Sequence, residues 1–264
     1  MSAPENTIDI LLLGSGGREH ALAAKLAESP RCGTLYIAPG NGGTLELGEN
    51  VALDAEDPSA VADFARETGC GLVVIGPEAP LVKGVADAVR EAGIPCFGPG
   101  AAGAQLEGSK RFSKELMARA GIPTAAYGSF TDEESALAYV REQGAPVVVK
   151  ADGLAAGKGV VVALTLDEAL QAVHECFDGA FGAAGSTVVI EEMLTGPECT
   201  LLAFTDGKTV RPMATSQDHK RALEGDLGPN TGGMGVYSPV PIVTDEEHAE
   251  MCRILDETIA AANR

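Results

Sequence analysis

Residues 146–162 decide the fold: they read Pro-Val-Val-Val-Lys-Ala-Asp-Gly-Leu-Ala-Ala-Gly-Lys-Gly-Val-Val-Val. Three valines lead into Lys150, and three more, Val160 to Val162, leave the glycine-rich connection. Two β-branched runs joined by a glycine-bearing connection predict an antiparallel β-hairpin. Glycine lets such a connection bend closely around a ligand, and its backbone N–H groups, with the ammonium groups of Lys150 and Lys158, suit a polyphosphate.

Two other interpretations compete with a phosphate-binding hairpin. A P-loop needs four residues between its glycines, then Lys and Ser/Thr, and then a helix. Here three residues separate Gly153 from Gly157, and Lys158 is followed by Gly159 and a run of valines, which disfavours a P-loop. The other interpretation is an ordinary glycine-rich turn with two solvated lysines. This stretch alone leaves that turn and a phosphate site open.

Composition limits the class of protein. A chain of 264 residues is long enough for two domains or one large one, and 45% apolar residues argue against disorder. The net charge of −19 argues against binding to nucleic acid or to an anionic membrane, because both need basic surface. The six cysteines show neither a C-x-x-C pair nor zinc spacing, which indicates reduced thiols in a cytoplasmic protein. Neither a targeting signal nor a membrane-length apolar run is recognisable.

A nucleotide-fold opening begins the chain. The apolar run Ile8–Leu13 predicts a buried parallel strand, and the sequence Gly-Ser-Gly-Gly-Arg-Glu-His at 14–20 leads into a helical pattern up to Ser29. Such a turn aims helix N-terminal N–H groups at an anion. Glu19 stands where a dinucleotide fingerprint needs glycine, and no acidic residue ends the second strand, so a nicotinamide cofactor is disfavoured. Arg18 could bind a phosphate or form a surface ion pair.

A second loop at a strand end follows. The predicted strand Leu72–Ile75 runs into Gly-Pro-Glu-Ala-Pro-Leu at 76–81, and ligands bind at this edge of open α/β sheets. Glu78 there could hold a sugar hydroxyl or an amine, or it could be an acidic residue at the start of a predicted helix Leu81–Ala92. Phe97 closes this domain, and Gly98-Pro99-Gly100 is its predicted exit.

The rest of the chain predicts a small α+β module and a long polar segment. A helix Lys110–Ala120, capped by Ser109, precedes the module at 126–194, which reads strand, helix, hairpin, helix, strand, with capping boxes at Thr131 and Thr165. A hairpin turns at Asp206-Gly207. The glycine-rich stretch 217–235 is typical of a functional loop, and a final helix is predicted at Asp245–Ala262.

Taken together, these motifs resemble the glycinamide ribonucleotide synthetase (phosphoribosylamine–glycine ligase) family of the ATP-grasp superfamily. The resemblance spans essentially the whole chain. It implies an α/β protein with a Rossmann-like (pre-ATP-grasp) parallel-sheet domain at 1–103 that binds substrate, and an ATP-grasp domain at 104–264 whose lid subdomain is 126–194. The motifs that carry it are Gly14–His20, Pro39–Gly43, Gly76–Leu81, Gly108–Phe112, Lys150–Gly159, Glu191–Glu198, Gln217–Arg221 and Gly228–Gly235.

The resemblance implies an ATP-dependent carbon–nitrogen ligase of purine biosynthesis that joins glycine to 5-phosphoribosylamine through a glycyl phosphate, with release of ADP. The implied catalytic residues are Lys150, Lys220 and Arg221. His219 is expected to position groups rather than to bind a metal. The implied ATP-binding residues are Lys110, Lys150, Gly157, Lys158, Gly159, Glu191, Glu192, Leu194 and Glu198. The implied substrate-binding residues are Gly16, Gly17, Arg18, Asn41, Glu78, Asp218, Asn230, Thr231 and Gly232.

Family members continue past the position of residue 264, and their magnesium ligands lie in that part. The chain is therefore expected to be C-terminally truncated, to contain no metal ligand of its own, and to be weak or inactive alone. A separate polypeptide could supply the rest, and Mn²⁺ could replace Mg²⁺. Two alternatives stay open: a nucleotide-binding fragment without turnover, and another ATP-grasp carboxylate–amine ligase.

Overall fold

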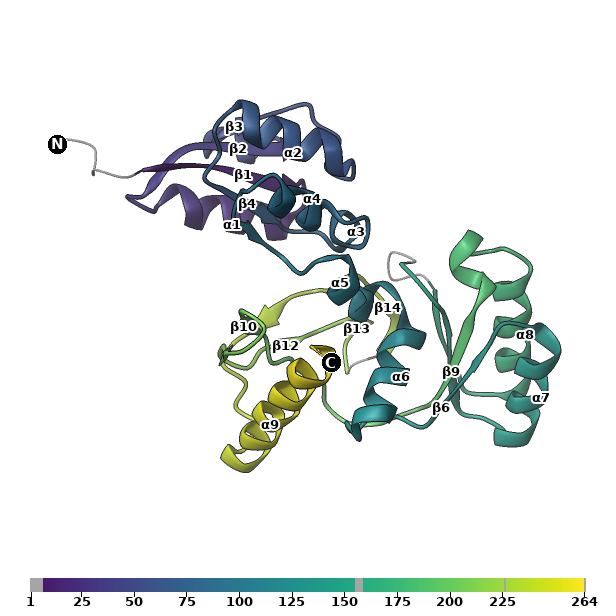
Figure 1. Ribbon diagram of the computed structural model, residues 1–264. Coiled ribbons are helices and arrows are strands. Elements are labelled where there is room, and N and C mark those ends of the chain that lie inside the picture. The colour runs from purple at the N-terminus through teal and green to yellow at the C-terminus, as the bar shows by residue number, and fades with distance from the viewer. Residues whose placement is uncertain (1–6, 155–158, 226, 264) are drawn as a thin grey trace. The chain divides into compact units, whose positions relative to one another are not determined.

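A computed structural model describes residues 7–154, 159–225 and 227–263, without the side chains of Ala183, Pro229 and Asn230. The chain divides into two compact units, Met1–Gly108 and Ser109–Arg264 (Figure 1). Helix α5 (Ala101–Gly108), which the sequence analysis did not predict, ends the first unit. The domain boundary expected from sequence, between 103 and 104, falls inside this helix.

The first unit is built on a five-stranded parallel sheet with the order β3-β2-β1-β4-β5. Strand β1 is central, and Leu11, Leu12 and Leu13 are fully buried, as expected for a parallel strand covered on both faces. The strands are β1 (Ile8–Gly14), β2 (Cys32–Pro39), β3 (Glu49–Asn50), β4 (Leu72–Ile75) and β5 (Cys96–Phe97). The predicted strands Ile8–Leu13 and Leu72–Ile75 are thus confirmed.

Helices cover both faces of this sheet. Ala23 of α1 (Gly17–Ala27) packs into the core on one face, with Ile10 and Leu12. Val61 of α2 (Pro58–Glu67) packs into the core on the other face, and the 3₁₀ turn η1 (Thr44–Glu46) follows β2. This two-sided cover leaves the carboxyl ends of the strands for ligands.

The helix predicted at Leu81–Ala92 is wrong in one respect: it is two helices, α3 (Glu78–Val82) and α4 (Val85–Glu91). Gly84 has a φ of +84°, in the left-handed region that glycine adopts without a Cβ clash, and it is the N-cap of α4. The apolar pattern runs through both helices, so periodicity alone hides this break.

The second unit contains a four-stranded antiparallel sheet with the order β6-β9-β7-β8. Helices α7 (Glu133–Gln143) and α8 (Leu166–Phe177) pack on one of its faces around Val149, Ala151 and Ile190. The strands are β6 (Tyr127–Phe130), β7 (Val147–Ala151), β8 (Val160–Ala163) and β9 (Val188–Glu192), and the 3₁₀ turn η2 (Gly182–Ser186) precedes β9. The predicted hairpin is confirmed, because β7 pairs with β8 from Val147↔Ala163 to Lys150↔Val160.

The helix caps follow the sequence with one exception. Ser109 Oγ accepts a hydrogen bond from Phe112 N at 3.1 Å and caps α6 (Lys110–Ala120), as predicted. The capping box of Thr165 with Glu168 is also confirmed. The box predicted at Thr131 is wrong, because Asp132 is the N-cap of α7 and its carboxylate accepts from Ser135 N at 2.8 Å.

The segment after β9 folds into short strand pairs, so the hairpin predicted around Asp206-Gly207 is confirmed, whereas the predicted loop at 217–235 contains further strands. The pairs are β10 (Ala203–Thr205) with β11 (Val210–Pro212), β12 (Gln217–Asp218) with β15 (Val236–Tyr237), and β13 (Arg221–Leu223) with β14 (Leu227–Asn230). The final helix is α9 (Asp245–Ala262), with the predicted bounds. Within the described ranges, every helix is too short or too polar to cross a membrane.

Candidate functional site

The face of the second unit's sheet that points away from α7 and α8 carries the residues of interest. Alternation along a strand sends Val147 and Val149 into the helical core, and therefore sends Val148 and Lys150 to the opposite face. In the β7–β9 ladder Val148 pairs with Glu191, so Glu191 lies on the same face as Lys150, as its diagonal neighbour.

This face also has an apolar floor. Val160 and Val162 of β8 are 39% and 37% exposed, although β-branched residues usually pack inside. Val160 is the direct partner of Lys150 in the hairpin ladder. An ammonium group beside exposed valines can hold a flat apolar ring that bears an anionic tail.

A buried ionic cluster lies at one edge of this floor. Glu191 Oε2 is 2.9 Å from Lys150 Nζ and 3.2 Å from Lys114 Nζ. Glu191 and Lys114 are only 7% and 8% exposed. Buried charges are tolerated in proteins when they are paired in this way.

Lys114 was missed by the sequence analysis. Its ammonium also donates to Thr124 Oγ1 at 2.7 Å and to Ala125 O at 3.3 Å, and lies 5.5 Å from the centre of the Tyr127 ring. The available signal was helical spacing, since Lys114 follows Lys110 by one turn on α6 and so shares its face.

The base of the hairpin is tied to the start of α6. Lys110 Nζ donates to Gly153 O at 2.9 Å. Asp152 accepts from Ser109 Oγ at 3.0 Å and from Arg111 N at 3.0 Å. Gly159 is buried and accepts from Ala151 N at 2.8 Å, whereas Gly157 and Lys158 lie outside the described residues.

The segment that follows β9 carries the other residues assigned to ATP. Glu192 Oε2 accepts from Ala126 N at 3.2 Å, and Leu194 is 67% exposed. Glu198 Oε2 accepts from Lys220 Nζ at 2.6 Å, and Asp218 Oδ2 is 4.0 Å from the same ammonium. The structure therefore brings together Glu198 of one motif with Asp218 and Lys220 of another.

The remaining assigned residues of this unit hold the short strands together. Arg221 donates to Gly228 O at 2.7 Å, and Thr231 Oγ1 donates to Lys220 O at 2.9 Å. Gly232 is exposed, and the side chain of Asn230 lies outside what is described. The His219 ring stacks on Tyr237 with centroids 5.3 Å apart.

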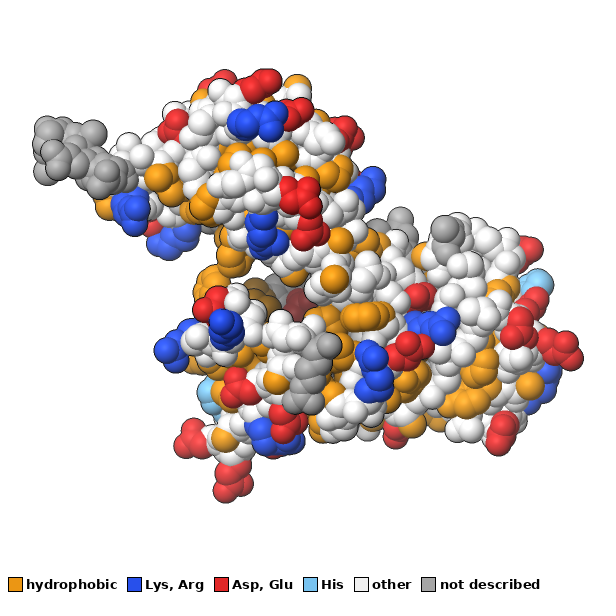
Figure 2. Space-filling model, in the orientation of Figure 1, with side chains coloured by type: hydrophobic (Ala, Val, Ile, Leu, Met, Phe, Trp, Pro, Cys, Tyr) orange, Lys and Arg blue, Asp and Glu red, His pale blue; other side chains and the backbone are white. Residues whose placement is uncertain are grey.

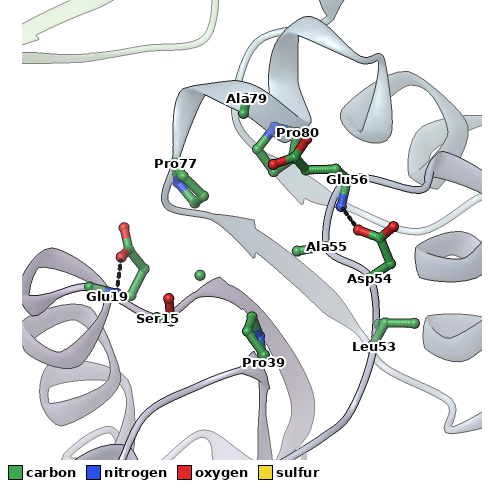
Figure 3. A pocket seen from close by; sticks show the side chains of 12 residues that line it. Ser15, Glu19, Pro39, Leu53, Asp54, Ala55, Glu56, Pro77, Ala79 and Pro80 are labelled. Carbon is green, nitrogen blue, oxygen red and sulfur yellow. Dashed lines mark hydrogen bonds between the residues drawn. The ribbon is translucent and has the colours of Figure 1, made fainter. Parts of the chain in front are cut away.

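The first unit has a cleft of about 400 Å³ at the carboxyl ends of its strands. Figure 3 shows Ser15 and Pro39 on one side and Pro77, Ala79 and Pro80, at the start of α3, on another. It opens above neighbouring β1 and β4, where the strand order reverses and open α/β sheets bind ligands. Its complete lining is Gly14, Ser15, Gly16, Glu19, Pro39, Leu53, Asp54, Ala55, Glu56, Pro77, Ala79 and Pro80.

Ionic contacts join the first turns of α1 and α3 at this cleft. Glu19, 3% exposed, accepts from Gly16 N at 2.8 Å and from Arg18 Nε at 3.0 Å. The other end of the Arg18 guanidinium lies 3.4 Å from Glu78 Oε2. The hydrogen bond that Arg18 donates to Glu19 raises the pKa of Arg18 above its already high value, so the guanidinium stays charged. Gly17 leaves open space beside its backbone.

Asn41 acts inside its own loop. Its Nδ2 donates to Ser15 O at 2.8 Å, and its Oδ1 accepts from Gly43 N and Thr44 N. The amide therefore fixes the loop after β2 against the glycine turn. Asp54 and Glu56, which the sequence analysis missed, line the cleft behind β3, a two-residue strand with no recognisable pattern.

Metal ligands were sought among the described residues. In residues 7–154, 159–225 and 227–263, no group of three or more His, Cys, Asp and Glu side chains is placed to hold a metal ion. Consequently no residue is assigned to a cation.

Two family models match the chain. Residues 8–107 match the phosphoribosylglycinamide synthetase N domain, and residues 108–264 match the phosphoribosylglycinamide synthetase ATP-grasp (A) domain. A phosphoribosylamine–glycine ligase of Rhizobium meliloti is 59% identical over 251 residues, covering 95% of this chain and 59% of the relative. One of Vibrio parahaemolyticus is 60% identical over 253 residues, covering 95% and 58%. The chain thus spans less than two thirds of the length of these relatives.

Solved structures agree with this similarity. The phosphoribosylamine–glycine ligase of Thermotoga maritima superposes with a TM-score of 0.81 and 30% identity, over 96% of this chain and 61% of that one. The N5-carboxyaminoimidazole ribonucleotide synthetase of Thermus thermophilus gives a TM-score of 0.71 at 21% identity, over 96% and 64%, and supports the fold alone. The predicted fold class is confirmed: a parallel-sheet α/β unit followed by an ATP-grasp domain with its α+β lid.

Proposed function

The chain belongs to the phosphoribosylglycinamide synthetase family, and we propose that it carries the substrate-binding and nucleotide-binding parts of a phosphoribosylamine–glycine ligase. In the proposed reaction ATP phosphorylates the carboxylate of glycine, giving glycyl phosphate and ADP. The amine of 5-phosphoribosylamine then attacks the acyl carbon, phosphate leaves, and the amide of glycinamide ribonucleotide forms, a step of purine biosynthesis. Relatives of that name, at 59% and 60% identity, support this assignment.

One observation carries the nucleotide part of the proposal: the Lys150 ammonium lies beside the exposed Val160 on the face of the sheet opposite α7 and α8. An adenine ring can lie on such valines, with its edge against the backbone of Glu192 and Leu194. The phosphates would reach Lys150 and Lys110, because charge-assisted contacts to phosphate are the strong ones. Gly159 would lie beside them, Glu191 would hold Lys150, and Glu198 would bind the ribose; Gly157 and Lys158 stay assigned to ATP from the sequence alone.

The cleft of the first unit is the proposed place for 5-phosphoribosylamine. Arg18 is its one cationic neighbour among the assigned residues, and it would bind the phosphate near Gly16 and Gly17, with Glu78 and the Asn41 loop close by. Since Gly16 N already donates to Glu19, we expect Arg18 to supply the main contact. Lys220 and Arg221 would act at the reaction centre, together with Asp218, Asn230, Thr231 and Gly232.

A divalent cation completes the proposal. Neutralising the charge of a triphosphate is the main task in phosphoryl transfer, so we propose Mg²⁺, with Mn²⁺ as a substitute, without assigning a ligand among the described residues. We further propose that the protein works in the cytoplasm.

Substitution of Lys150 by Met tests the nucleotide site. We expect the affinity for ATP to fall by about tenfold or more, because one charge-assisted hydrogen bond is lost. Isothermal titration calorimetry measures this directly. Lys25→Met is the matched control: it removes the same charge from an exposed pair with Glu28 and should leave ATP binding as it was. Equal ATP affinity in Lys150→Met and the unaltered chain would remove Lys150 from the site.

The substrates are tested separately by product analysis. ATP, glycine and 5-phosphoribosylamine are supplied together, and glycinamide ribonucleotide is sought by mass spectrometry alongside ADP. Alanine, aspartate and D-alanine replace glycine in parallel reactions. ADP formation that is indifferent to the carboxylate would favour another ATP-grasp ligase over the proposed one.

A further inference from the structure

Two ammonium groups share one carboxylate oxygen in the second unit. Lys150 Nζ and Lys114 Nζ lie 2.9 Å and 3.2 Å from Glu191 Oε2. With all three groups ionised, the cluster carries one surplus positive charge. Whether Lys114 or Lys150 carries this surplus charge determines whether the cluster can bind an anionic ligand.

Burial and hydrogen bonding divide the roles of the two lysines. The Lys114 side chain is 10% exposed, and its ammonium donates to Thr124 Oγ1 and Ala125 O besides its ion pair with Glu191 Oε2. The Lys150 side chain is 26% exposed and stands on the open face beside Val160. Lys114 is thus fixed from the inside, whereas Lys150 can turn to a ligand.

We propose that Lys114 is a positioning residue for the nucleotide: it neutralises Glu191 from the buried side and so leaves the charge of Lys150 available to a phosphate. This inference rests on the proposed function, because it takes Lys150 as a phosphate contact. Without Lys114, Lys150 would be the partner that neutralises a buried carboxylate. A phosphate would then have to draw it away and leave that carboxylate uncompensated, which is costly.

The same contacts join three elements. Lys114 belongs to α6, its acceptors Thr124 and Ala125 precede β6, and Glu191 lies in β9. The ammonium therefore sets the place of Glu191 relative to α6, whose first residue, Lys110, reaches the base of the hairpin at Gly153. Lys114 contacts no nucleotide in the proposed site. Through these contacts it positions Lys150 and Lys110, which do.

Charge substitutions at 114 and 191 distinguish this role from simple packing. In Lys114→Met we expect ATP affinity to fall about tenfold, with adenosine affinity unchanged, since adenosine carries no phosphate. In Lys114→Met/Glu191→Gln we expect most of the ATP affinity to return, because Lys150 no longer has a carboxylate to neutralise. A purely structural role predicts the opposite, a double variant that binds ATP no better than Lys114→Met.

A shape-conserving variant keeps the test valid if Lys114→Met fails to fold. Glu191→Gln retains both lysines, and adding Lys114→Met to it should change ATP affinity by less than about threefold, because no carboxylate is left for Lys114 to neutralise. A further loss of about tenfold when Lys114→Met is added to Glu191→Gln would overturn the proposal, because Lys114 would then act without the carboxylate. Lys114→Arg, which keeps the charge, should bind ATP within about threefold of the unaltered chain.

Lys150→Met distinguishes failure of the proposed role of Lys114 from failure of the proposed nucleotide site. If it weakens ATP binding while Lys114→Met does not, the role of Lys114 is wrong and the nucleotide site stands. If Lys150→Met leaves ATP binding unchanged, both proposals fall. Calorimetry with ATP, ADP and adenosine, and a thermal melt of each variant, supply all the readings.

Discussion

Glu19 fills space that three glycines leave open. A Cβ at Gly14 would lie 2.3 Å from its Cγ, one at Gly76 2.4 Å from its Oε1, and one at Gly16 2.8 Å from its Oε2. The carboxylate thus occupies the turn between β1 and α1, and it already binds the Gly16 N–H that could otherwise face an anion. Glu19, which stands where the dinucleotide fingerprint needs glycine, therefore has a structural role in this turn.

Removal of this side chain should destabilise the first unit. In Glu19→Ala the Gly16 N–H loses its acceptor and a gap opens between the glycines, so we expect a loss of about 1–3 kcal/mol in the free energy of unfolding. Urea denaturation measures it. Glu28→Ala is the control, because Glu28 is exposed and pairs only across the surface with Lys25; its effect should stay within about 0.5 kcal/mol. Equal stability of the two variants would contradict the role given to Glu19.

Single residues of interest were easier to predict from the sequence than the contacts between them. Lys150 and Glu191 were both singled out, but the sequence does not predict their contact, because 41 positions separate them. Lys114 was missed because a lysine on an amphipathic helix is normally solvated, and only the fold buries it. Asn41 was singled out for substrate, whereas its amide is engaged by Ser15, Gly43 and Thr44.

Elements of the lid were predictable because local chemistry and tertiary structure agree there. The valine runs, the glycines between them and the Thr165 cap all favour the same hairpin and helix. Where local signals conflict, prediction failed: Gly84 splits one apolar pattern into α3 and α4. Helix α5 was overlooked because its Ala- and Gly-rich sequence lacks a clear amphipathic pattern.

A pH-dependent contact joins the two helices of the lid. His174 Nδ1 in α8 lies 2.8 Å from Glu133 Oε1 in α7, and this hydrogen bond raises the pKa of His174 above its usual value near 6.5. A raised folded-state pKa means that the pairing stabilises the protein fully below the unfolded pKa. That stabilisation is lost as pH rises through the folded pKa.

We therefore expect Glu133→Gln to lower the pKa of His174 towards that of an unpaired histidine. The titration is followed by NMR on the imidazole protons. Glu134→Gln removes the same charge from the next position of α7 and should leave most of the shift in place. A His174 pKa that responds equally to both substitutions would mean that general charge, rather than the contact, raises it.

Burial is unevenly distributed over the whole molecule. The first unit has a core on each face of its sheet, and the lid has a core beneath α7 and α8. Among the described residues after Ile190, only Glu191, Thr215 and Val240 are buried. Large apolar side chains are exposed in this part, namely Leu194, Leu202, Phe204, Met213, Leu223, Leu227, Met234, Val236, Tyr237 and Ile242.

The surface agrees with the charge of −19. On the face that Figure 2 shows, lysines and arginines lie among acidic side chains. Exposed ion pairs such as Lys83–Glu56 and Arg111–Glu115 belong to this mixed surface. An acidic molecule must attract a polyphosphate through local lysines, and the proposed ATP site has such lysines in the Lys114–Glu191–Lys150 cluster. Composition predicted this requirement, but the position of the cluster depends on strand register.

Hydrogen exchange should reveal the uneven burial. Local opening costs little where few apolar side chains are buried, so the amides of β10 to β15 should exchange about 100-fold faster or more than those of β1, β7 and β9. Mass spectrometry of peptides from the intact chain resolves these segments. In α9, whose residues are all at least partly exposed, we expect intermediate protection from its helical hydrogen bonds and its Thr244 cap. Because exchange is read segment by segment, protection of β10–β15 equal to that of β7 would mean that the strand pairs, rather than buried apolar contacts, set the local stability.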